Sequence, residues 1–370
     1  MSGWRKEPFD AVIADKSSGN IKTPQSEFLP SGRYPIVDQS KALVAGYTDD
    51  ESRLCRAALP VIVFGDHTRC FKYVDFPFCM GADGVKVLRP KVDSDVKYLY
   101  HYLRQLPLTH GGYDRHFKYL KRSSIVLPPI SEQRRIAELL DKADALRAKR
   151  RAAIAQLDAL TRSIFLDMFG DPATNPNGFP VMTLDEVFDI ARGGSPRPID
   201  AFITDAEDGL NWIMIGDASE GSKYITKTRK RIKPEGARRS RAVKPGDFLL
   251  TNSMSFGRPY IMRTSGCIHD GWLVLSPRSA KVEADYFYNL LGSQAVFAEF
   301  VRRAPGATVK NLNIDLVRGV RVPIAPLEQQ LEFSRIITKV EQASSLHQRS
   351  DEELKHLFTV LQHRAFRGEL

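Results

Sequence analysis

The chain has 370 residues, of which 42% are hydrophobic and 26% are charged, a balance typical of folded globular proteins. Its formal net charge of +10 favours a polyanionic partner such as nucleic acid, although a basic protein without such a partner stays an alternative. No apolar run reaches the roughly 18 residues that a membrane span needs, and no signal-peptide pattern is visible. The four cysteines form no CxxC pair. We therefore expect a cytoplasmic protein with reduced thiols, no metal site and no membrane contact.

An internal repeat organises the chain. Four groups of residues recur in the same order, with an offset that drifts as loops differ in length. The echoes pair Phe9, Val12, Ile13 and Gly19 with Leu184, Val187, Phe188 and Gly194, DGVKVLRP (83–90) with DGWLVLSP (270–277), YLYHYL (98–103) with YFYNLL (286–291), and Pro129 and Gln133 with Pro326 and Gln330. Each recurring group is weak evidence alone, but four groups in the same order indicate a tandem duplication.

Each copy begins with a mixed segment and ends in a long helix. Residues 1–130 and 170–326 show short β-rich runs punctuated by Gly and Pro, with a short helix near each tyrosine-rich echo. Residues 131–169 and 327–370 each show one long helical pattern that contains no Pro. A helix of that length would extend about 55–60 Å. The expected fold class is α+β, with two similar mixed α/β domains separated by two long antiparallel helices and related by pseudo-twofold symmetry.

The long helices carry a heptad pattern typical of a coiled coil, although two amphipathic helices on separate cores are an alternative. Polar Arg150 and His347 take equivalent places in it, and we hypothesise that they face each other and fix the helix register. The predicted apolar seam consists of Ile136, Leu139, Ala143, Leu146, Leu157, Leu160 and Ile164 on the first helix, and Phe333, Ile336, Val340, Leu354, Leu357 and Leu361 on the second.

Such an arrangement would hold two similar domains at a fixed separation. If both faced a DNA duplex, they would read two half-sites separated by unread base pairs.

Two stretches resemble a known family. PPISEQRRIAELLDKADAL (128–146), and FGDPATNPNGFP (169–180) just beyond the first helix, resemble the specificity subunit of type I restriction–modification systems. The family ends each target-recognition domain with PPxxEQ and a long helix, and it enters the second domain through FGDPxTNPxG. GGSPRP (193–198) resembles its Gly-containing loop. The resemblance covers the whole chain.

The resemblance implies a subunit without catalytic activity or cofactors of its own. It would recognise a bipartite site in double-stranded DNA and hold two adenine-methyltransferase subunits, and the assembly would cleave DNA when restriction/translocase subunits join. S-adenosylmethionine, ATP and Mg are expected on those partners. By motif, the domain–helix junctions are marked by Pro129, Glu132, Gln133, Pro326, Gln329 and Gln330. The second copy reads APLEQQ, with its acid one place early, which weakens any specific role for Glu132.

The strongest charge signal is the segment Lys223–Lys244, which holds ten Lys or Arg residues and one acid, Glu235. A solvated loop would explain it, but so many cations in a recognition domain favour phosphate contacts. The predicted DNA-binding residues there are Lys227, Arg229, Lys230, Arg231, Arg238, Arg239 and Arg241. Further candidates near predicted turns are Asn252, Ser255 and Arg258 in the second domain, and Arg33, His67, Arg69 and Lys72 in the first.

Two other classes of protein remain to be weighed. A scaffold whose two domains bind proteins would not retain DNA. A fused methyltransferase would need an NPPY-like motif, and NPNGFP (175–180) lacks the second Pro and the adjacent aromatic residue. No phosphate loop and no GxSxG or HExxH motif occurs either.

Overall fold

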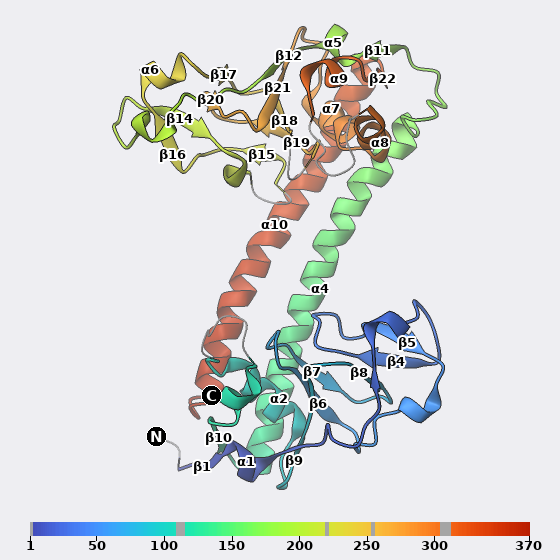
Figure 1. Cartoon of the computed structure of the whole chain (residues 1–370), viewed down its shortest axis with the longest axis vertical. Coiled ribbons are helices and arrows are strands. Elements are labelled where there is room, and N and C mark those ends of the chain that lie inside the picture. Colours follow the sequence, from blue (N-terminus) through green and yellow to red (C-terminus); the bar gives the residue numbers. More distant parts are fainter. Residues whose placement is uncertain (1–2, 109–114, 219–221, 253–255, 304–311) are drawn as a thin grey trace. The chain divides into compact units, whose positions relative to one another are not determined.

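The computed structural model describes residues 3–108, 115–218, 222–252, 256–303 and 312–370 (Figure 1). The chain forms two compact units, residues 1–152 with 349–370 (unit 1) and residues 153–348 (unit 2). Helix α4 (Ile130–Phe169) begins in unit 1 and ends in unit 2, whereas α10 (Leu327–Ala365) begins in unit 2 and ends in unit 1. Each unit therefore contains one mixed domain, the start of one long helix and the end of the other.

The described residues of unit 1 form three sheets. The four-stranded sheet β2-β9-β6-β7 is antiparallel, β3-β8-β4-β5 is mixed, and β1 pairs with β10. The elements are β1 (Arg5–Pro8), α1 (Phe9–Val12), β2 (Ile13–Asp15), β3 (Lys22–Thr23), β4 (Tyr34–Val37), β5 (Gly46–Thr48), β6 (Val61–Gly65), β7 (Phe71–Val74), β8 (Cys79–Gly81), β9 (Val85–Pro90), α2 (Val96–Gln105), α3 (Phe117–Leu120) and β10 (Ser124–Leu127).

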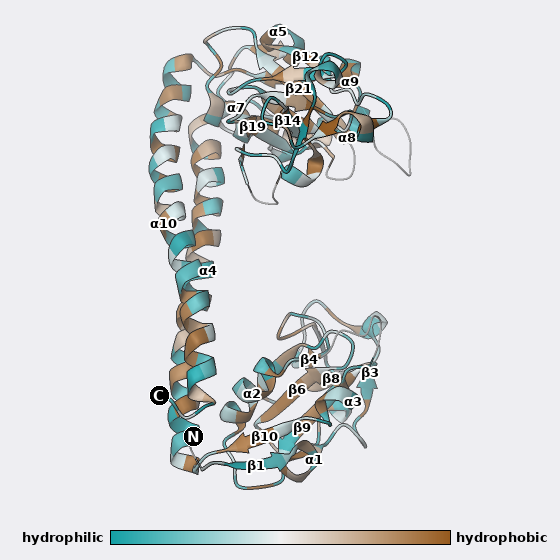
Figure 2. Cartoon of the chain, turned by 90° about the vertical axis from the view of Figure 1, so that its left-hand side faces the viewer, coloured by the Kyte–Doolittle hydropathy of each residue, from teal (hydrophilic) through white to brown (hydrophobic). Residues whose placement is uncertain are grey.

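The main core of unit 1 joins the domain to both long helices. Ile136 and Leu140 at the start of α4 pack in one cluster with Phe358 and Phe366 near the end of α10. The ring of Phe366 meets Tyr98 of α2 edge-on at 5.6 Å. Strand β6 is buried along its whole length, and Figure 2 shows it among the hydrophobic ribbons of this unit. The domain is therefore anchored to an antiparallel helix pair by apolar burial.

Unit 2 repeats this plan with two five-stranded sheets, β12-β21-β18-β19-β15 and β13-β16-β14-β20-β17, and the pair β11-β22. Its elements are β11 (Val181–Thr183), α5 (Leu184–Val187), β12 (Phe188–Arg192), β13 (Ile203–Thr204), β14 (Leu210–Ile213), β15 (Tyr224–Ile225), β16 (Lys230–Ile232), α6 (Pro234–Ala237), β17 (Arg241–Val243), β18 (Phe248–Thr251), β19 (Pro259–Met262), β20 (Gly266–Ile268), β21 (Trp272–Pro277), α7 (Ala284–Leu291), α8 (Gln294–Arg303), α9 (Ile314–Arg318) and β22 (Arg321–Pro323).

The core of unit 2 again unites a domain with both long helices. Phe165 and Phe169 at the end of α4 lie 5.6 and 5.4 Å from the ring of Phe333 at the start of α10. Both also contact Tyr286 of α7, as Phe366 contacts Tyr98 in unit 1. The predicted fold class is confirmed, because the mixed domains, the long helices and their antiparallel packing within each unit are all present.

The structure corrects part of the predicted helix seam. Predicted members Ile136 and Phe333 are buried, but Leu146, Leu160 and Leu357 are 55%, 45% and 59% exposed. The inward positions lie one residue further on and include Leu140, Ile337 and Phe358. Predicted members Leu139 and Ile336 are only half-buried. A heptad seam steps by three and four residues alternately, and here the step of four follows Ile136.

Within the described ranges, no helix combines the length and the apolar character needed to cross a membrane.

Candidate nucleic-acid interface

The domain–helix junction of unit 1 is fastened by a buried glutamine. The side-chain oxygen of Gln133 accepts hydrogen bonds from Ser94 Oγ (2.8 Å) and from the backbone N–H of Asp95 (2.9 Å), the N-cap of α2. Its amide nitrogen donates to the carbonyl oxygen of Pro128 at 2.9 Å. One side chain of α4 therefore holds both the start of α2 and the end of the strand that precedes α4.

Unit 2 repeats this junction with Gln330. Its side-chain oxygen accepts from the backbone N–H of Glu283 (3.1 Å), the N-cap of α7, and its amide nitrogen donates to the carbonyl oxygen of Ala325 (2.8 Å). Tyr286 adds a further repeat, because its hydroxyl donates to Pro323 O as the hydroxyl of Tyr98 donates to Val126 O.

The other residues predicted at the junctions divide into two groups. Pro129 and Pro326 supply the carbonyl oxygens that accept the first backbone bonds of α4 and α10. Glu132 instead forms an ion pair with Arg135 one turn along its helix, and Gln329 is exposed. The junction thus uses the proline carbonyl and the buried glutamine in both copies, whereas the acid takes no part in the hydrogen bonds that Gln133 makes.

Ion pairs fasten each domain to its long helix a turn or more beyond the glutamine. In unit 1, Arg104 of α2 contacts Asp144 of α4 at 2.6 Å. In unit 2, Lys223 contacts Asp285 of α7 and Glu341 of α10. Burial alone would lower the pKa of Lys223, but its two carboxylate partners raise that pKa above the ordinary value. Lys223 is therefore a structural cation rather than a free one.

Most of the basic segment of unit 2 belongs to the sheet β13-β16-β14-β20-β17 and to α6, rather than to one long loop. Lys230 and Arg231 lie on β16, Arg238 and Arg239 follow α6, and Arg241 begins β17. All seven predicted cations of this segment are exposed. Strands fix the backbones of Lys230, Arg231 and Arg241, and Arg238 and Arg239 directly follow α6, whereas Lys227 and Arg229 lie in the segment before β16.

Three of these arginines are also held through their side chains. Arg229 donates to Gly216 O at 2.7 Å while its side chain stays 77% exposed. Arg231 donates to the carbonyls of Ala206 and Glu207, at 3.3 and 3.4 Å, and the guanidinium of Arg239 lies 5.5 Å from the ring centroid of Phe202. Such contacts reduce the side-chain entropy that is lost when an arginine binds a phosphate or a base.

Among the DNA-binding residues predicted in the first domain, the structure excludes one from contact with DNA. Lys72 is buried, and its ammonium donates to Asp38 O at 2.7 Å, so it cannot reach DNA and was wrongly predicted. Arg33 is exposed beside Tyr34, and His67 and Arg69 are half-buried in the turn between β6 and β7.

The candidates after β18 also need correction. Asn252 is 1% exposed, and its side-chain amide donates to Asp270 O at 3.2 Å, so it supports the turn before β21 rather than contacting bases. Arg258 is half-buried at the start of β19. Ser255 lies outside the described residues.

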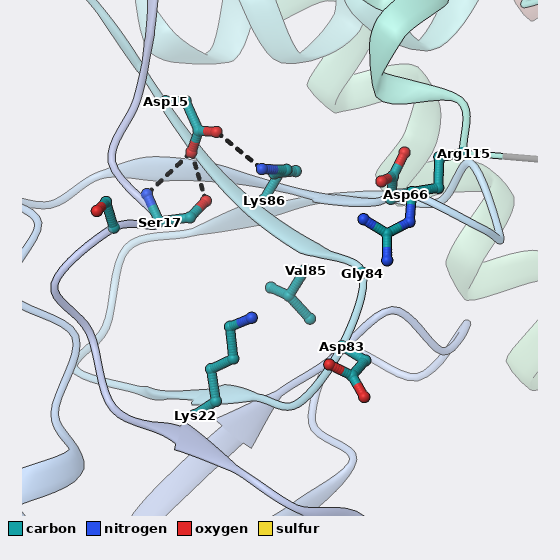
Figure 3. A pocket seen from close by; sticks show the side chains of 10 residues that line it. Asp15, Ser17, Lys22, Asp66, Asp83, Gly84, Val85, Lys86 and Arg115 are labelled. Atoms are coloured by element: carbon teal, nitrogen blue, oxygen red, sulfur yellow. Dashed lines mark hydrogen bonds and ion pairs between the residues drawn. The ribbon is translucent and has the colours of Figure 1, made fainter.

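A polar pocket in unit 1 was not predicted from the sequence. Its volume is about 260 Å³, and Figure 3 shows the Lys22 side chain reaching into it from β3, with Arg115 and Asp66 at one end. Lys22 and Arg115 are far apart in sequence, so no charge run marked them. Across the described part of the chain, no group of His, Cys, Asp or Glu residues is arranged to hold a metal ion.

Comparison with known proteins identifies the class of this fold. The profile of the type I restriction modification DNA specificity domain matches residues 13–156. The EcoBI specificity subunit of Escherichia coli is 25% identical over 289 residues, which are 68% of this chain and 59% of that subunit. The Escherichia coli EcoR124I/EcoR124II specificity subunit is 30% identical over 128 residues, 31% of this chain and 32% of that subunit. The chain therefore spans about three fifths or less of these two relatives.

Solved structures agree on the fold. A chain from a type I restriction–modification system solved for its complex assembly and conformational transition matches with a TM-score of 0.58 and 19% identity, over 100% of this chain and 99% of that one. The S subunit from M. genitalium matches with a TM-score of 0.60 and 16% identity, over 98% and 96%. The profile, the relatives and the fold of the solved structures all indicate a type I restriction–modification DNA specificity subunit, in agreement with the resemblance seen in the sequence.

Proposed function

We propose that this protein is the non-catalytic DNA-recognition subunit of a type I restriction–modification complex. Each domain reads one half of a bipartite site, and the long helices set the gap between the half-sites. The helices also dock two adenine-methyltransferase subunits, which bind S-adenosylmethionine and carry out the chemistry, while restriction/translocase subunits that use ATP and Mg add cleavage. The proposal extends the similarity to specificity subunits to the activities and partners of the whole complex.

The observation that carries the proposal is the set of seven exposed cations on and around β16, α6 and β17 of unit 2. Phosphate contacts by Lys and Arg supply most of the affinity of a protein for DNA and make that affinity depend on salt. Five of the seven cations lie on strands or directly after α6, and three of the seven are positioned by side-chain contacts. That is the arrangement a phosphate-binding surface requires.

The experiment measures binding of the full chain to a 30-base-pair duplex over a range of salt concentrations. Affinity should fall steeply with salt, and K230A/R241A should make the log–log slope shallower by about 1.8, since each phosphate contributes about 0.9. The matched control K281A/R335A removes one exposed Lys and one exposed Arg elsewhere in unit 2 and should leave the slope unchanged. Binding that does not depend on salt, or no retention of DNA, would favour the protein scaffold instead.

A further inference from the structure

The GGSPRP loop (193–198) of unit 2 follows β12 and is held against two other strands by its backbone. The N–H groups of Gly193 and Gly194 donate to carbonyl oxygens of β21 and β20, at 2.9 and 3.1 Å. A Cβ on Gly193 would clash with the carbonyl oxygen of His269, so this close approach requires a glycine. The ring of Pro196 is buried. The residue that follows this proline is therefore presented from a backbone of fixed position.

The loop lies beside the cations that follow α6. The carbonyl oxygen of Ile268, which accepts from Gly194 N–H, also accepts from Ser240 Oγ at 2.8 Å. A Cβ on Gly194 would lie 3.2 Å from the carbonyl oxygen of Arg239, so the two backbones are in close contact. The loop that carries Arg197 therefore adjoins the predicted DNA-binding residues after α6.

Arg197 is exposed and lies beside one carboxylate. Its side chain is 73% exposed, and its Nη2 lies 3.5 Å from Asp270 Oδ2. The other oxygen of that carboxylate accepts from Ser195 Oγ at 2.7 Å. The backbone of the same aspartate is also held, because its carbonyl oxygen accepts from the side chains of Asn252 (3.2 Å) and Arg192 (3.1 Å). The bond from Ser195 lowers the pKa of Asp270 below its ordinary value, so the carboxylate is charged at neutral pH.

The pair of Arg197 and Asp270 suits the edge of a guanine better than a phosphate. Arginine reads guanine by donating two hydrogen bonds to O6 and N7 in the major groove. The side chain of Asp270 is 50% exposed, and its negative charge would repel a phosphate, whereas a guanine is neutral. The contact of 3.5 Å is longer than a usual hydrogen bond, so the guanidinium donors remain available to a base. An orientation set before binding also lowers the entropy cost of both bonds.

We propose that Arg197 is a specificity-determining residue of unit 2 that reads a guanine in its half-site, and that Asp270 is the residue that positions it. The inference rests on the proposed function and deepens it, because it assigns one base to one side chain. The exposed cations on and around β16, α6 and β17 supply phosphate contacts, which carry no sequence information, whereas Arg197 discriminates between bases. The charge pattern did not mark Arg197, because it is a single cation between two prolines.

The test maps methylated adenines across the genomes of cells that express the full chain or its variants. R197K keeps the charge but loses the planar fork of donors, so the preference for one guanine in one half-site should fall by roughly 5- to 150-fold. Every other position of the motif should keep its preference. D270N should weaken the preference for the same guanine and no other. The matched control R278A removes an exposed arginine that pairs with Asp189 (3.0 Å) beyond the far end of β21, and should leave the motif unchanged.

The outcomes separate this inference from the proposed function. If R197K gives the wild-type motif, or reduces methylation equally at all sites, Arg197 does not read a base and the inference fails, although the proposed function stands. R197A, which also removes the charge, should relax the same guanine, and relaxation of several positions at once would indicate a disturbed fold and overturn the inference. If the wild-type chain gives no bipartite adenine methylation, the proposed function fails, and this inference fails with it.

Discussion

The side chain of Gln330 accepts a hydrogen bond from the backbone N–H of Glu283 at 3.1 Å, and so ties the first turns of α10 to the cap of α7. Gln133 makes the same bond to Asp95 in the other unit. In each unit, the side-chain carboxamide of one glutamine hydrogen-bonds the long helix to its domain. These hydrogen bonds would couple the orientation of each domain to that of its long helix.

Replacing Gln133 with Leu should destabilise the junction of unit 1 by about 1–3 kcal/mol, because Asp95 N–H and Pro128 O would be left buried without partners. Hydrogen exchange of the α2 amides measures the loss. Gln330→Leu should act in the same way on α7. Gln329→Ala, at an exposed position beside it, should change the free energy of unfolding by less than about 0.5 kcal/mol. If Gln330→Leu and Gln329→Ala changed the free energy of unfolding equally, the hydrogen bonds of Gln330 would not be what stabilises the junction.

The corrected seam predicts opposite outcomes for neighbouring leucines. Leu140→Ala should cost about 2–5 kcal/mol because it leaves a cavity against Phe358 and Phe366, whereas Leu146→Ala should be nearly neutral because that side chain is 55% exposed. Urea unfolding of both variants makes the comparison. A large loss of unfolding free energy for Leu146→Ala would instead support the seam predicted from the heptad pattern.

The polar pair hypothesised within the helices has its own test. Arg150 and His347 are both half-buried at the heptad positions predicted for them. If they fix the helix register at a cost in stability, replacing both with Leu should raise the melting temperature. No change, or a fall, in a thermal melt would argue against that role.

Unit 1 should lose stability in mild acid because of His101. Burial lowers the pKa of His101 below its ordinary value of about 6.5, although the hydrogen bond to Asp141 (2.8 Å) opposes this. The unfolded chain therefore takes up a proton that the folded chain resists, and the contribution to stability is complete above about pH 6.5 and declines as the pH falls toward 5. The decline is at most about 1.4 kcal/mol per pH unit.

His101→Gln keeps an N–H for Asp141 but does not titrate. Urea unfolding at pH 7, 6 and 5 should give a shallower pH dependence for this variant than for the wild-type protein. An unchanged dependence would mean that His101 is not the group responsible. Asp141 does not interfere, because its hydrogen bonds from Lys97 and His101 lower its pKa despite burial, and its own contribution is lost only below about pH 4.

The sequence predicted the repeat, the fold class and the junction glutamines, because all three depend on patterns that recur along the chain. It could not decide between Leu139 and Leu140, since both are apolar and a step of three or four residues fits a heptad; packing against the domain decides. Lys72 looked like an exposed turn residue because Asp38, which binds it, lies 34 residues away in sequence. The pocket cations were missed for the same reason.

The central claim is tested most directly by mapping methylated adenines across the genome of cells with and without this chain. The account predicts a bipartite motif, two specific half-sites separated by unspecified base pairs, whose methylation is present with the chain and absent without it. Methylation that is identical in both cells, while an adenine methyltransferase of a type I system is expressed in both, would contradict the account.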